Sequence, residues 1–194
     1  MNKSVGVMGG SFDPPHHGHI SIAKSFLLSG LIDRLVVIPV FVPPHKSDDL
    51  SGYDIRLRMA RVAFSGIGHT EVSDLESWLP VPSYSWNTLM HLKRSAAGSV
   101  IRVCMGGDSL AEFTGWYRYK DILDQVDLIV AERPGFSRPD LPAEFEGRVT
   151  YIKHEPLDIS ATEIRRMASD GVLSGEYIPE GVIKIISEEG LYRS

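Results

Sequence analysis

Two histidines, His16 and His19, stand three residues apart in the segment GGSFDPPHHGH at positions 9–19. A short apolar run precedes the segment and apolar residues at helical spacing follow it, so both histidines fall near the start of a predicted helix. Residues three apart share one face of a helix, and the free amides and dipole of a helix N-terminus favour an anion. Two imidazoles there can donate hydrogen bonds to a polyphosphate and stabilise the charge that develops during a transfer.

Three other interpretations apply to the same segment. Histidines often only cap a helix or pack in a core. Together with Asp13 and His17 they could bind zinc or another transition metal, but a metal would need a further ligand at a fitting spacing. Asp13 before proline is also typical of a turn, which is compatible with any of these roles. His17 is one residue from His16, so we expect its ring to point away.

Gly9 and Gly10 would let the backbone turn sharply and bring its amides close to a ligand. The pattern G-x-G-x-x-G is absent, and no Gly-Lys-Ser/Thr follows, so the segment is neither a dinucleotide-binding fingerprint nor a Walker A loop. A glycine pair alone is often only a turn.

A second group of phosphate-binding residue types lies in ISATEIR at positions 159–165. Ser160 and Glu163 have the spacing of a capping box, which by itself would be purely structural. Thr162 and Arg165 are three apart and share a helix face, so a hydroxyl and a guanidinium could together hold a nucleotide phosphate. We expect Arg166 to point toward solvent.

Four further candidates each have a plain structural alternative. Lys46 follows two prolines and a histidine and is either a surface lysine or a phosphate contact. Asp108 follows two glycines and either caps a helix or accepts a hydrogen bond from a ribose. Trp116 either packs or stacks on a flat heteroaromatic ring. Cys104, the only cysteine, cannot form an internal disulfide and is predicted to be a buried small hydrophobe.

Strands and helices alternate along the chain, which predicts an α/β fold: a Rossmann-like, doubly wound, mostly parallel sheet with helices on both faces and a small C-terminal helical part. Apolar β-branched runs predict strands at 4–8, 34–40, 70–78, 99–105, 127–135 and 148–155. Helical spacing predicts helices at 19–30, 54–66, 86–96, 120–126, 161–171 and 179–190. Asp54 is expected to cap the second helix, and Pro179 to occupy the first turn of the last.

In such folds ligands bind outside the carboxyl ends of the strands. The segments that follow the predicted strands are GGSFDPPHHGH, VPPHK, GGDS, ERPG and LDISATEIR. They are rich in glycine, histidine, lysine, arginine, serine and threonine, the residue types that hold phosphate. The sequence therefore predicts that these segments meet at one edge of the sheet and bind a phosphorylated ligand there.

The 194 residues suit one domain, which we expect to span 1–194, and the composition is that of an ordinary globular protein. The net charge of −5 argues against a nucleic-acid partner, which would need a basic face, but not against small phosphorylated ligands. MNKSVGVMGG reaches glycine before any apolar signal region forms, and no apolar run could span a membrane. We expect a cytoplasmic protein without a membrane partner. The sequence leaves open whether it forms a homo-oligomer.

The segments GGSFDPPHHGH and ISATEIR resemble those of the bacterial nicotinate-nucleotide adenylyltransferases, a family within the HxGH nucleotidyltransferases. Five further segments resemble the same family in the same order and extend the likeness over nearly the whole chain. They are VPPHK (42–46), PSYSWNTL (82–89), GGDSL with the tryptophan that follows (106–116), ERPG (132–135) and EEGLY (188–192). Ser11, Gly107 and Ala161 are mild departures from the family pattern.

The resemblance implies that nicotinic acid mononucleotide attacks the α-phosphorus of ATP through its 5′-phosphate, in NAD biosynthesis. The products would be the deamido dinucleotide and pyrophosphate. Mg²⁺ would accompany ATP, with no side-chain metal site, and no covalent enzyme intermediate would form. By the family pattern the roles fall on three sets of residues. The residues that carry out the transfer would be His16, His19, Lys46 and Arg165. Those that bind ATP and its phosphates would be Gly9, Gly10, Ser11, Phe12, Gly106, Asp108, Ser160 and Thr162. Those that bind the nicotinate mononucleotide would be Tyr84, Ser85, Trp116 and Arg133.

Several alternatives remain at this point. The acceptor could be nicotinamide mononucleotide or phosphopantetheine, and a cytidylyltransferase would share the HxGH element while using CTP. A non-catalytic nucleotide-binding module is a different class, as is a zinc hydrolase. The combination of His16, His19, Lys46 and Arg165 argues against a mere sensor, which needs affinity but no transition-state donors.

Overall fold

The computed structural model describes residues 3–44, 50–133, 135 and 137–193. Its centre is a six-stranded sheet in which all neighbours are parallel and the strand order is β3-β2-β1-β4-β5-β6. The strands are β1 (Ser4–Gly10), β2 (Arg34–Pro39), β3 (Thr70–Val72), β4 (Val100–Gly106), β5 (Asp127–Glu132) and β6 (Val149–Lys153). The order reverses between β1 and β4, the place where doubly wound sheets bind ligands. The predicted α/β fold class is confirmed.

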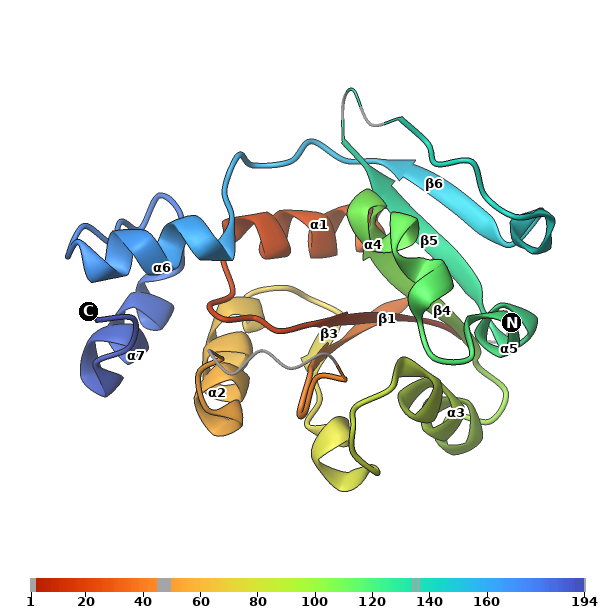
Figure 1. The fold of residues 1–194 in the computed structure, drawn as a ribbon, viewed down its shortest axis with the longest axis horizontal. Coiled ribbons are helices and arrows are strands. Elements are labelled where there is room, and N and C mark those ends of the chain that lie inside the picture. The colour runs from red at the N-terminus through yellow and green to blue at the C-terminus, as the bar shows by residue number, and fades with distance from the viewer. Residues whose placement is uncertain (1–2, 45–49, 134, 136, 194) are drawn as a thin grey trace.

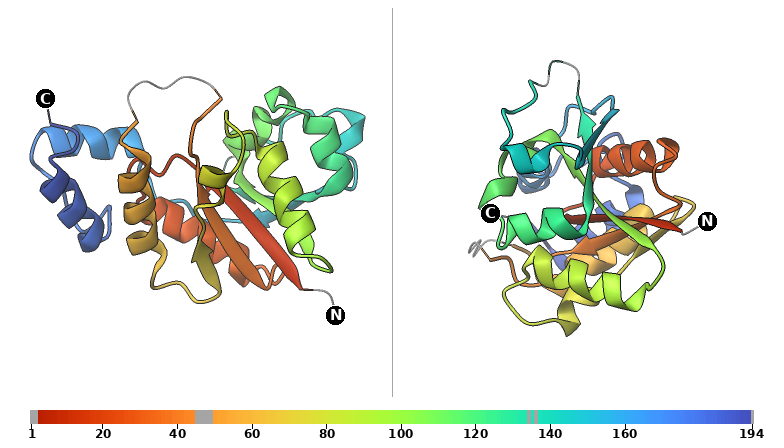
Figure 2. Two further views of the ribbon diagram at one scale, coloured as in Figure 1. Left: turned by 90° about the horizontal axis from the view of Figure 1, so that it is seen from below. Right: turned by 90° about the vertical axis from the view of Figure 1, so that its right-hand side faces the viewer.

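Helices cover both faces of the sheet (Figures 1 and 2). The α-helices are α1 (His17–Leu28), α2 (Tyr53–Phe64), α3 (Ser85–Ser95), α4 (Gly107–Ala111), α5 (Tyr119–Gln125), α6 (Ala161–Ser169) and α7 (Glu180–Glu189). One apolar core lies between the sheet and α1, α2, α6 and α7, and a second lies on the opposite face beneath α3, α4 and α5. The central strands are therefore buried on both faces, which explains their almost continuous apolar sequences.

The helices α6 and α7 stand at one end of the molecule, where α7 packs against α2 (Figures 1 and 2). This is the small C-terminal helical part that the sequence predicts. A β-carbon on Gly181 of α7 would lie only 2.5 Å from a methyl carbon of Val62 on α2. The close approach of these two helices brings the end of the chain back to the sheet edge where β1 ends.

Three local predictions are wrong. The strand expected at 70–78 ends at Val72, because the polar residues after it form a turn: the Ser73 hydroxyl accepts a hydrogen bond from Leu75 N, and a 3-10 helix follows at Leu75–Trp78. Asp54 does not cap α2; the capping position is Gly52, without a side-chain hydrogen bond, and Asp54 lies in the first turn. Pro179 is the residue before α7 and not its first residue.

The short helix α4 was not foreseen, because GGDSLA is too short to show a helical period. Within the described residues, no helix combines the length and the apolarity needed to cross a membrane. That the whole chain forms one domain stays a prediction.

Candidate functional site

The two histidines of HHGH form a reciprocal cap on the N-terminus of α1. His16 is the capping residue with an extended backbone, and its Nδ1 accepts a hydrogen bond from Gly18 N at 3.1 Å. His19 Nδ1 accepts in turn from His16 N at 3.2 Å. The two ring centroids are 3.8 Å apart. Histidine thus fills both positions of a capping box, where serine and glutamate are usual.

This cap fixes the tautomer of both rings. Because each Nδ1 accepts a hydrogen bond, each neutral imidazole carries its proton on Nε2. The first turn of α1, all of which is described, contains no acidic residue that would repel an anion. The capping role proposed for these histidines is therefore correct, and it leaves two Nε2–H donors at a helix N-terminus for a ligand.

Burial keeps both rings uncharged. His16 is 7% exposed, and burial, with a smaller contribution from His17, lowers its pKa to about 4. Burial and then the neighbouring His16 lower the pKa of His19 to about 3. At neutral pH the pair therefore consists of two neutral donors. The ring of His17 points away, as expected, with its Nε2 3.2 Å from the carbonyl oxygen of Gly175.

These lowered pKa values predict an acid-sensitive fold. In the unfolded chain each ring titrates near 6.5, so between about pH 6.5 and 4 the unfolded state binds more protons at these positions than the folded state. The free energy of unfolding should therefore fall as the pH falls through this window. Urea unfolding between pH 7 and pH 4.5 checks this against the double variant His16→Asn/His19→Gln, which should show a shallower fall.

Asparagine and glutamine are suited to the two positions of a capping box, so this variant removes the titrating rings and retains the cap. The variant His17→Asn, which removes a neighbouring ring that does not take part in the cap, is the control. Parallel stability curves for the wild type and the double variant would contradict the prediction.

The predicted glycine turn lies directly beside this pair. Gly9, Gly10 and Ser11 line a cavity at the carboxyl end of β1. Phe12 has a left-handed backbone (φ 50°), and its buried ring meets the ring of His19 edge-on at 5.1 Å between centroids. A β-carbon on Gly10 would lie 3.0 Å from this ring. A side chain at position 10 would therefore press on the Phe12 ring, which supports His19 from the core side.

The second predicted phosphate segment meets the first, although about 150 residues separate them in the sequence. Arg165 donates from Nη1 to the carbonyl oxygen of Asp13 at 2.9 Å and from Nη2 to the Thr162 hydroxyl at 3.2 Å. The capping box of Ser160 and Glu163 is present at the start of α6. Arg166 is exposed, as expected. The N-termini of α1 and α6, each with its cap formed, therefore both lie beside the loop that follows β1.

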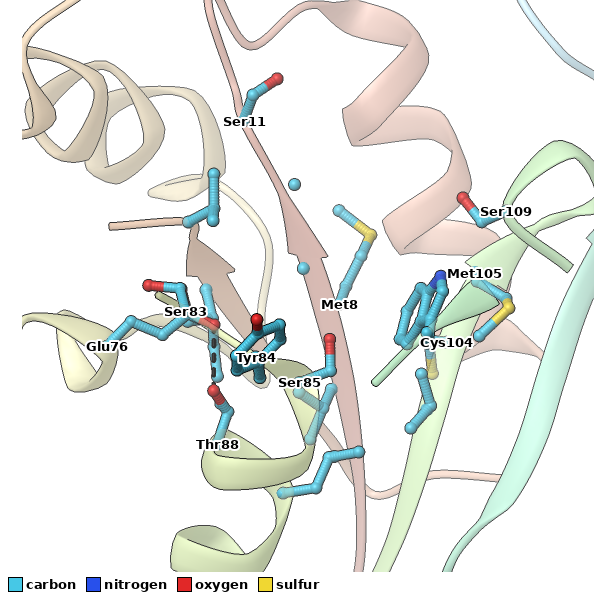
Figure 3. A pocket seen from close by; sticks show the side chains of 18 of the residues that line it. Met8, Ser11, Glu76, Ser83, Tyr84, Ser85, Thr88, Cys104, Met105 and Ser109 are labelled. Atoms are coloured by element: carbon cyan, nitrogen blue, oxygen red, sulfur yellow. Dashed lines mark hydrogen bonds between the residues drawn. The ribbon is translucent and has the colours of Figure 1, made fainter. Parts of the chain in front are cut away.

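The cavity beside this loop has a volume of about 880 Å³ and extends from β1 between α3 and α4 (Figure 3). In this view Ser11 lies at the top, Ser85 below the middle, and Ser109 at the right, across from Ser83 and Glu76. The predicted ring-binding residues Tyr84, Ser85 and Trp116 all line it, as does Gly106. Cys104 lies in its floor, and burial raises the pKa of its thiol to about 12, so it is a packed thiol and not a nucleophile.

Three aromatic side chains, Tyr84, Trp116 and Tyr117, are among those that line this cavity. The rings of Tyr84 and Tyr117 are 4.4 Å apart at an angle of 32°. The Trp116 ring packs against buried Phe113 at 4.9 Å and also lines the cavity. A flat ring that entered here would meet aromatic side chains, of which Trp116 is held in place by its packing against Phe113.

Asp108 and Arg133 lie together at the ends of β4 and β5. Arg133 Nη2 contacts both carboxylate oxygens of Asp108, at 2.9 and 3.0 Å, and both side chains are exposed. The capping role considered for Asp108 is wrong, because Gly106 is the capping residue of α4 and makes no side-chain cap. Lys46 lies outside the described residues. No cluster of three or more histidine, cysteine or carboxylate side chains suited to a metal occurs in the part of the chain that the structure describes.

Sequence reasoning missed three residues that hold this site together. Arg56 is 2% exposed and donates to the carbonyl oxygens of Ser51 and Ser11, both at 2.9 Å. Glu76 lines the cavity, accepts from Phe41 N at 3.1 Å and from the Thr88 hydroxyl at 3.0 Å, and has its pKa raised by burial. The third is Gly18, where a β-carbon would lie 2.8 Å from His16 Nδ1. Only Gly18 carried a signal, as the glycine between the two histidines just before the predicted helix.

Comparison with known proteins defines the class and then the family. A family model described as cytidylyltransferase-like matches residues 7–167, which assigns the chain to the nucleotidyltransferase class. Among curated relatives, proteins named "Probable nicotinate-nucleotide adenylyltransferase" from Geobacter metallireducens and Pelobacter propionicus are 32% and 34% identical to this chain, each over 97% of both chains. The chain belongs to the nicotinate-nucleotide adenylyltransferase family, which confirms the resemblance drawn from its motifs.

Solved structures agree on the fold. The nicotinic acid mononucleotide adenylyltransferase of Plasmodium falciparum, in a complex with NaAD, superposes with a TM-score of 0.77 at 20% identity, over 98% of this chain and 97% of that one. A structure described as a putative nicotinate-nucleotide adenylyltransferase from Vibrio parahaemolyticus gives a TM-score of 0.73 at 21% identity, over 99% and 96%. The chain therefore has the whole fold of these enzymes.

Proposed function

We propose that this chain transfers the adenylyl group of ATP to nicotinic acid mononucleotide, giving nicotinic acid adenine dinucleotide and pyrophosphate in NAD biosynthesis. The observation that carries the proposal is the pair of capped, neutral imidazoles at the start of α1, next to Arg165 and Thr162 and beside an aromatic-lined cavity. This arrangement offers hydrogen-bond donors to phosphates at one end and an aromatic-lined cavity for a flat ring at the other.

The reaction needs donors and positioning more than a nucleophile on the protein. The 5′-phosphate of the mononucleotide is already ionised at neutral pH, so no general base has to activate it. One of its oxygens bonds to the α-phosphorus of ATP as the bond to the β-phosphate breaks, and pyrophosphate leaves with the electron pair. Nε2–H of His16 and of His19 would stabilise the charge that builds on the phosphate oxygens.

The other residues would bind and orient the two substrates. Arg165 and Thr162, with Ser160 at the same helix start, would hold the ATP phosphates, together with Lys46. Backbone of the loop after β1 would face the nucleotides, and Gly106 and Asp108 would face the ribose or base. The nicotinate ring would lie against Trp116 near Tyr84 and Ser85, and Arg133, which is paired with Asp108 in this structure, would approach the mononucleotide from the end of β5.

Magnesium would enter as MgATP, as part of the substrate. The triphosphate oxygens would provide most of its ligands, as is usual for Mg²⁺ bound with a nucleotide. No step in this mechanism depends on a side chain that binds the metal. A cytoplasmic location is part of the same proposal.

A pyrophosphate-release assay tests the activity. We expect release from MgATP with nicotinic acid mononucleotide, at a kcat/KM clearly above that with nicotinamide mononucleotide, and none with phosphopantetheine. Replacing ATP by CTP under the same conditions should abolish turnover. A preference for the amide would contradict the proposed acceptor, and release without any mononucleotide would indicate a hydrolase instead.

A further inference from the structure

The carboxylate of Asp13 is buried at the centre of the phosphate loop, where segments from distant parts of the chain meet. The residue is 1% exposed. Its Oδ2 accepts from Ser51 N at 3.1 Å, and its Oδ1 accepts from the hydroxyl of Tyr192 at 2.5 Å. Its own carbonyl oxygen accepts from Arg165 at 2.9 Å. One residue therefore links the loop after β1, the start of α2, the helix α6 and the end of the chain.

Because of this position, Asp13 fixes both phosphate-binding elements relative to each other: the histidine pair at the start of α1 and Arg165 on α6. Arg165 takes its direction from the carbonyl of Asp13, and His16 follows Asp13 after two prolines, which limit the backbone between them. Ser11, on the other side of Asp13, is held by buried Arg56. A rotation of Asp13 would thus move Arg165 relative to the histidine pair.

The side chain that fixes Asp13 from outside the loop is Tyr192, in the turn after α7. An O–H···O⁻ bond of 2.5 Å is in the range of strong, charge-assisted hydrogen bonds. Burial and the hydrogen bond to Asp13 raise the pKa of Tyr192, so its hydroxyl stays protonated and remains a donor. Since the carboxylate is buried, loss of this donor would leave Oδ1 without a hydrogen-bond partner among the described residues, a costly state that favours rearrangement of the side chain.

We propose that Tyr192 is a positioning residue for adenylyl transfer, which holds Asp13 so that Arg165 and the two histidines face the same phosphates. The inference rests on the proposed function. Tyr192 would touch neither substrate, and its effect would appear in the rate of transfer more than in affinity, because small misplacements of catalytic groups cost rate steeply. The end of the chain, far from the loop in sequence, would in this way set the geometry of the active site.

The variant Tyr192→Phe removes only the hydroxyl. We expect kcat to fall roughly 10- to 30-fold, with the KM values for ATP and mononucleotide changed less than about threefold. Measurements are made well below the melting temperature, with the folded fraction of each sample determined by circular dichroism. Tyr177→Phe is the matched control: it makes the same chemical change just before α7, and the hydroxyl of Tyr177 makes no hydrogen bond with any described residue. It should keep wild-type kcat.

Two further measurements separate positioning from general damage. In the background Asp13→Ala, where no side-chain acceptor is left for the Tyr192 hydroxyl, Tyr192→Phe should cost less than about threefold if it acts through Asp13. Long-range ¹H–¹⁵N spectra of the histidine rings should show His16 and His19 as Nε2–H tautomers in the wild type, and a mixture of tautomers for His16 in Tyr192→Phe.

The outcomes that overturn the inference are distinct from those that overturn the function. A kcat of Tyr192→Phe within twofold of wild type, equal losses in both Asp13 backgrounds, or an unchanged His16 tautomer would each contradict it. If the wild type failed to turn over ATP with nicotinic acid mononucleotide, the proposed function would fall, and the histidine spectra would still test whether Tyr192 orders the loop.

Discussion

Replacement of His16 or His19 by alanine is expected to lower kcat by roughly 10²–10³, with a much smaller effect on KM, as for the loss of a donor used mainly in the transition state. Each ring is held by its Nδ1 in the cap of α1, so that Nε2–H is fixed before substrate arrives. The donors need no reorganisation as charge moves, which is the condition under which such groups contribute most. Steady-state kinetics of pyrophosphate release measures the effect.

Alanine at these positions also removes a helix cap, so a second pair of variants is needed. His16→Asn and His19→Gln provide the acceptors that a capping box requires, and lack an imidazole Nε2–H. They should melt close to the wild type and still lose kcat to a similar extent. His17→Ala, which removes the neighbouring ring that faces Gly175, should keep most of the activity. If the Asn and Gln variants turned over near the wild-type rate, the histidines would be structural caps only.

The arrangement of the sheet followed from the sequence because its causes are local and periodic. Apolar runs such as those of β1 and β2 alternate with helical spacing, and parallel strands need crossovers of this kind. The errors arose where polar side chains compete with regular structure. Ser73 ended β3 early by accepting from Leu75 N, and Asp54 entered the first turn of α2 without capping it. In neither case does the residue type alone decide the outcome.

The residues of the site also divide into those that the sequence predicts and those that it does not. His16, His19, Thr162 and Arg165 could be found because spacing places them on a helix face and the topology brings strand ends together. The charged side chains that are buried behind these residues could not be found in this way, because their burial depends on partners far along the chain. The buried carboxylate of Asp13 accepts hydrogen bonds from Ser51 N and the Tyr192 hydroxyl, and nothing in the sequence near position 13 indicates either partner.

The ring end of the cavity shows a related limit. Glu76 belongs to a stretch that resembled a strand, and a strand would have placed its side chain by alternation. The 3-10 turn instead sends its carboxylate inward to Phe41 N and Thr88. A wrong secondary structure over a few residues was therefore enough to hide a buried acid that lines the proposed ring site.

The variant Gly18→Ala should be severely impaired although it adds only a methyl group, and we expect kcat to fall by about 10²-fold. A β-carbon at position 18 would lie 2.8 Å from Nδ1 and 2.9 Å from Cε1 of His16, closer than atoms in contact can approach. The ring would have to swing away from the amide of residue 18, losing both its place and the bond that fixes its tautomer. Glycine between the two histidines is needed because the imidazole lies where a side chain would begin.

The sign of the stability change makes this prediction specific. Alanine is normally the better helix residue, by about 0.5–1 kcal/mol, so Gly18→Ala should stabilise α1 wherever His16 does not obstruct it. In the background His16→Ala, which removes the obstructing ring, the same substitution should therefore raise the melting temperature and cost no further activity. Gly66→Ala, at a turn with no atom within 4 Å of the added carbon, controls for the change itself. Equal losses of kcat from Gly18→Ala with and without the His16 ring would show that the glycine serves some purpose other than making room for it.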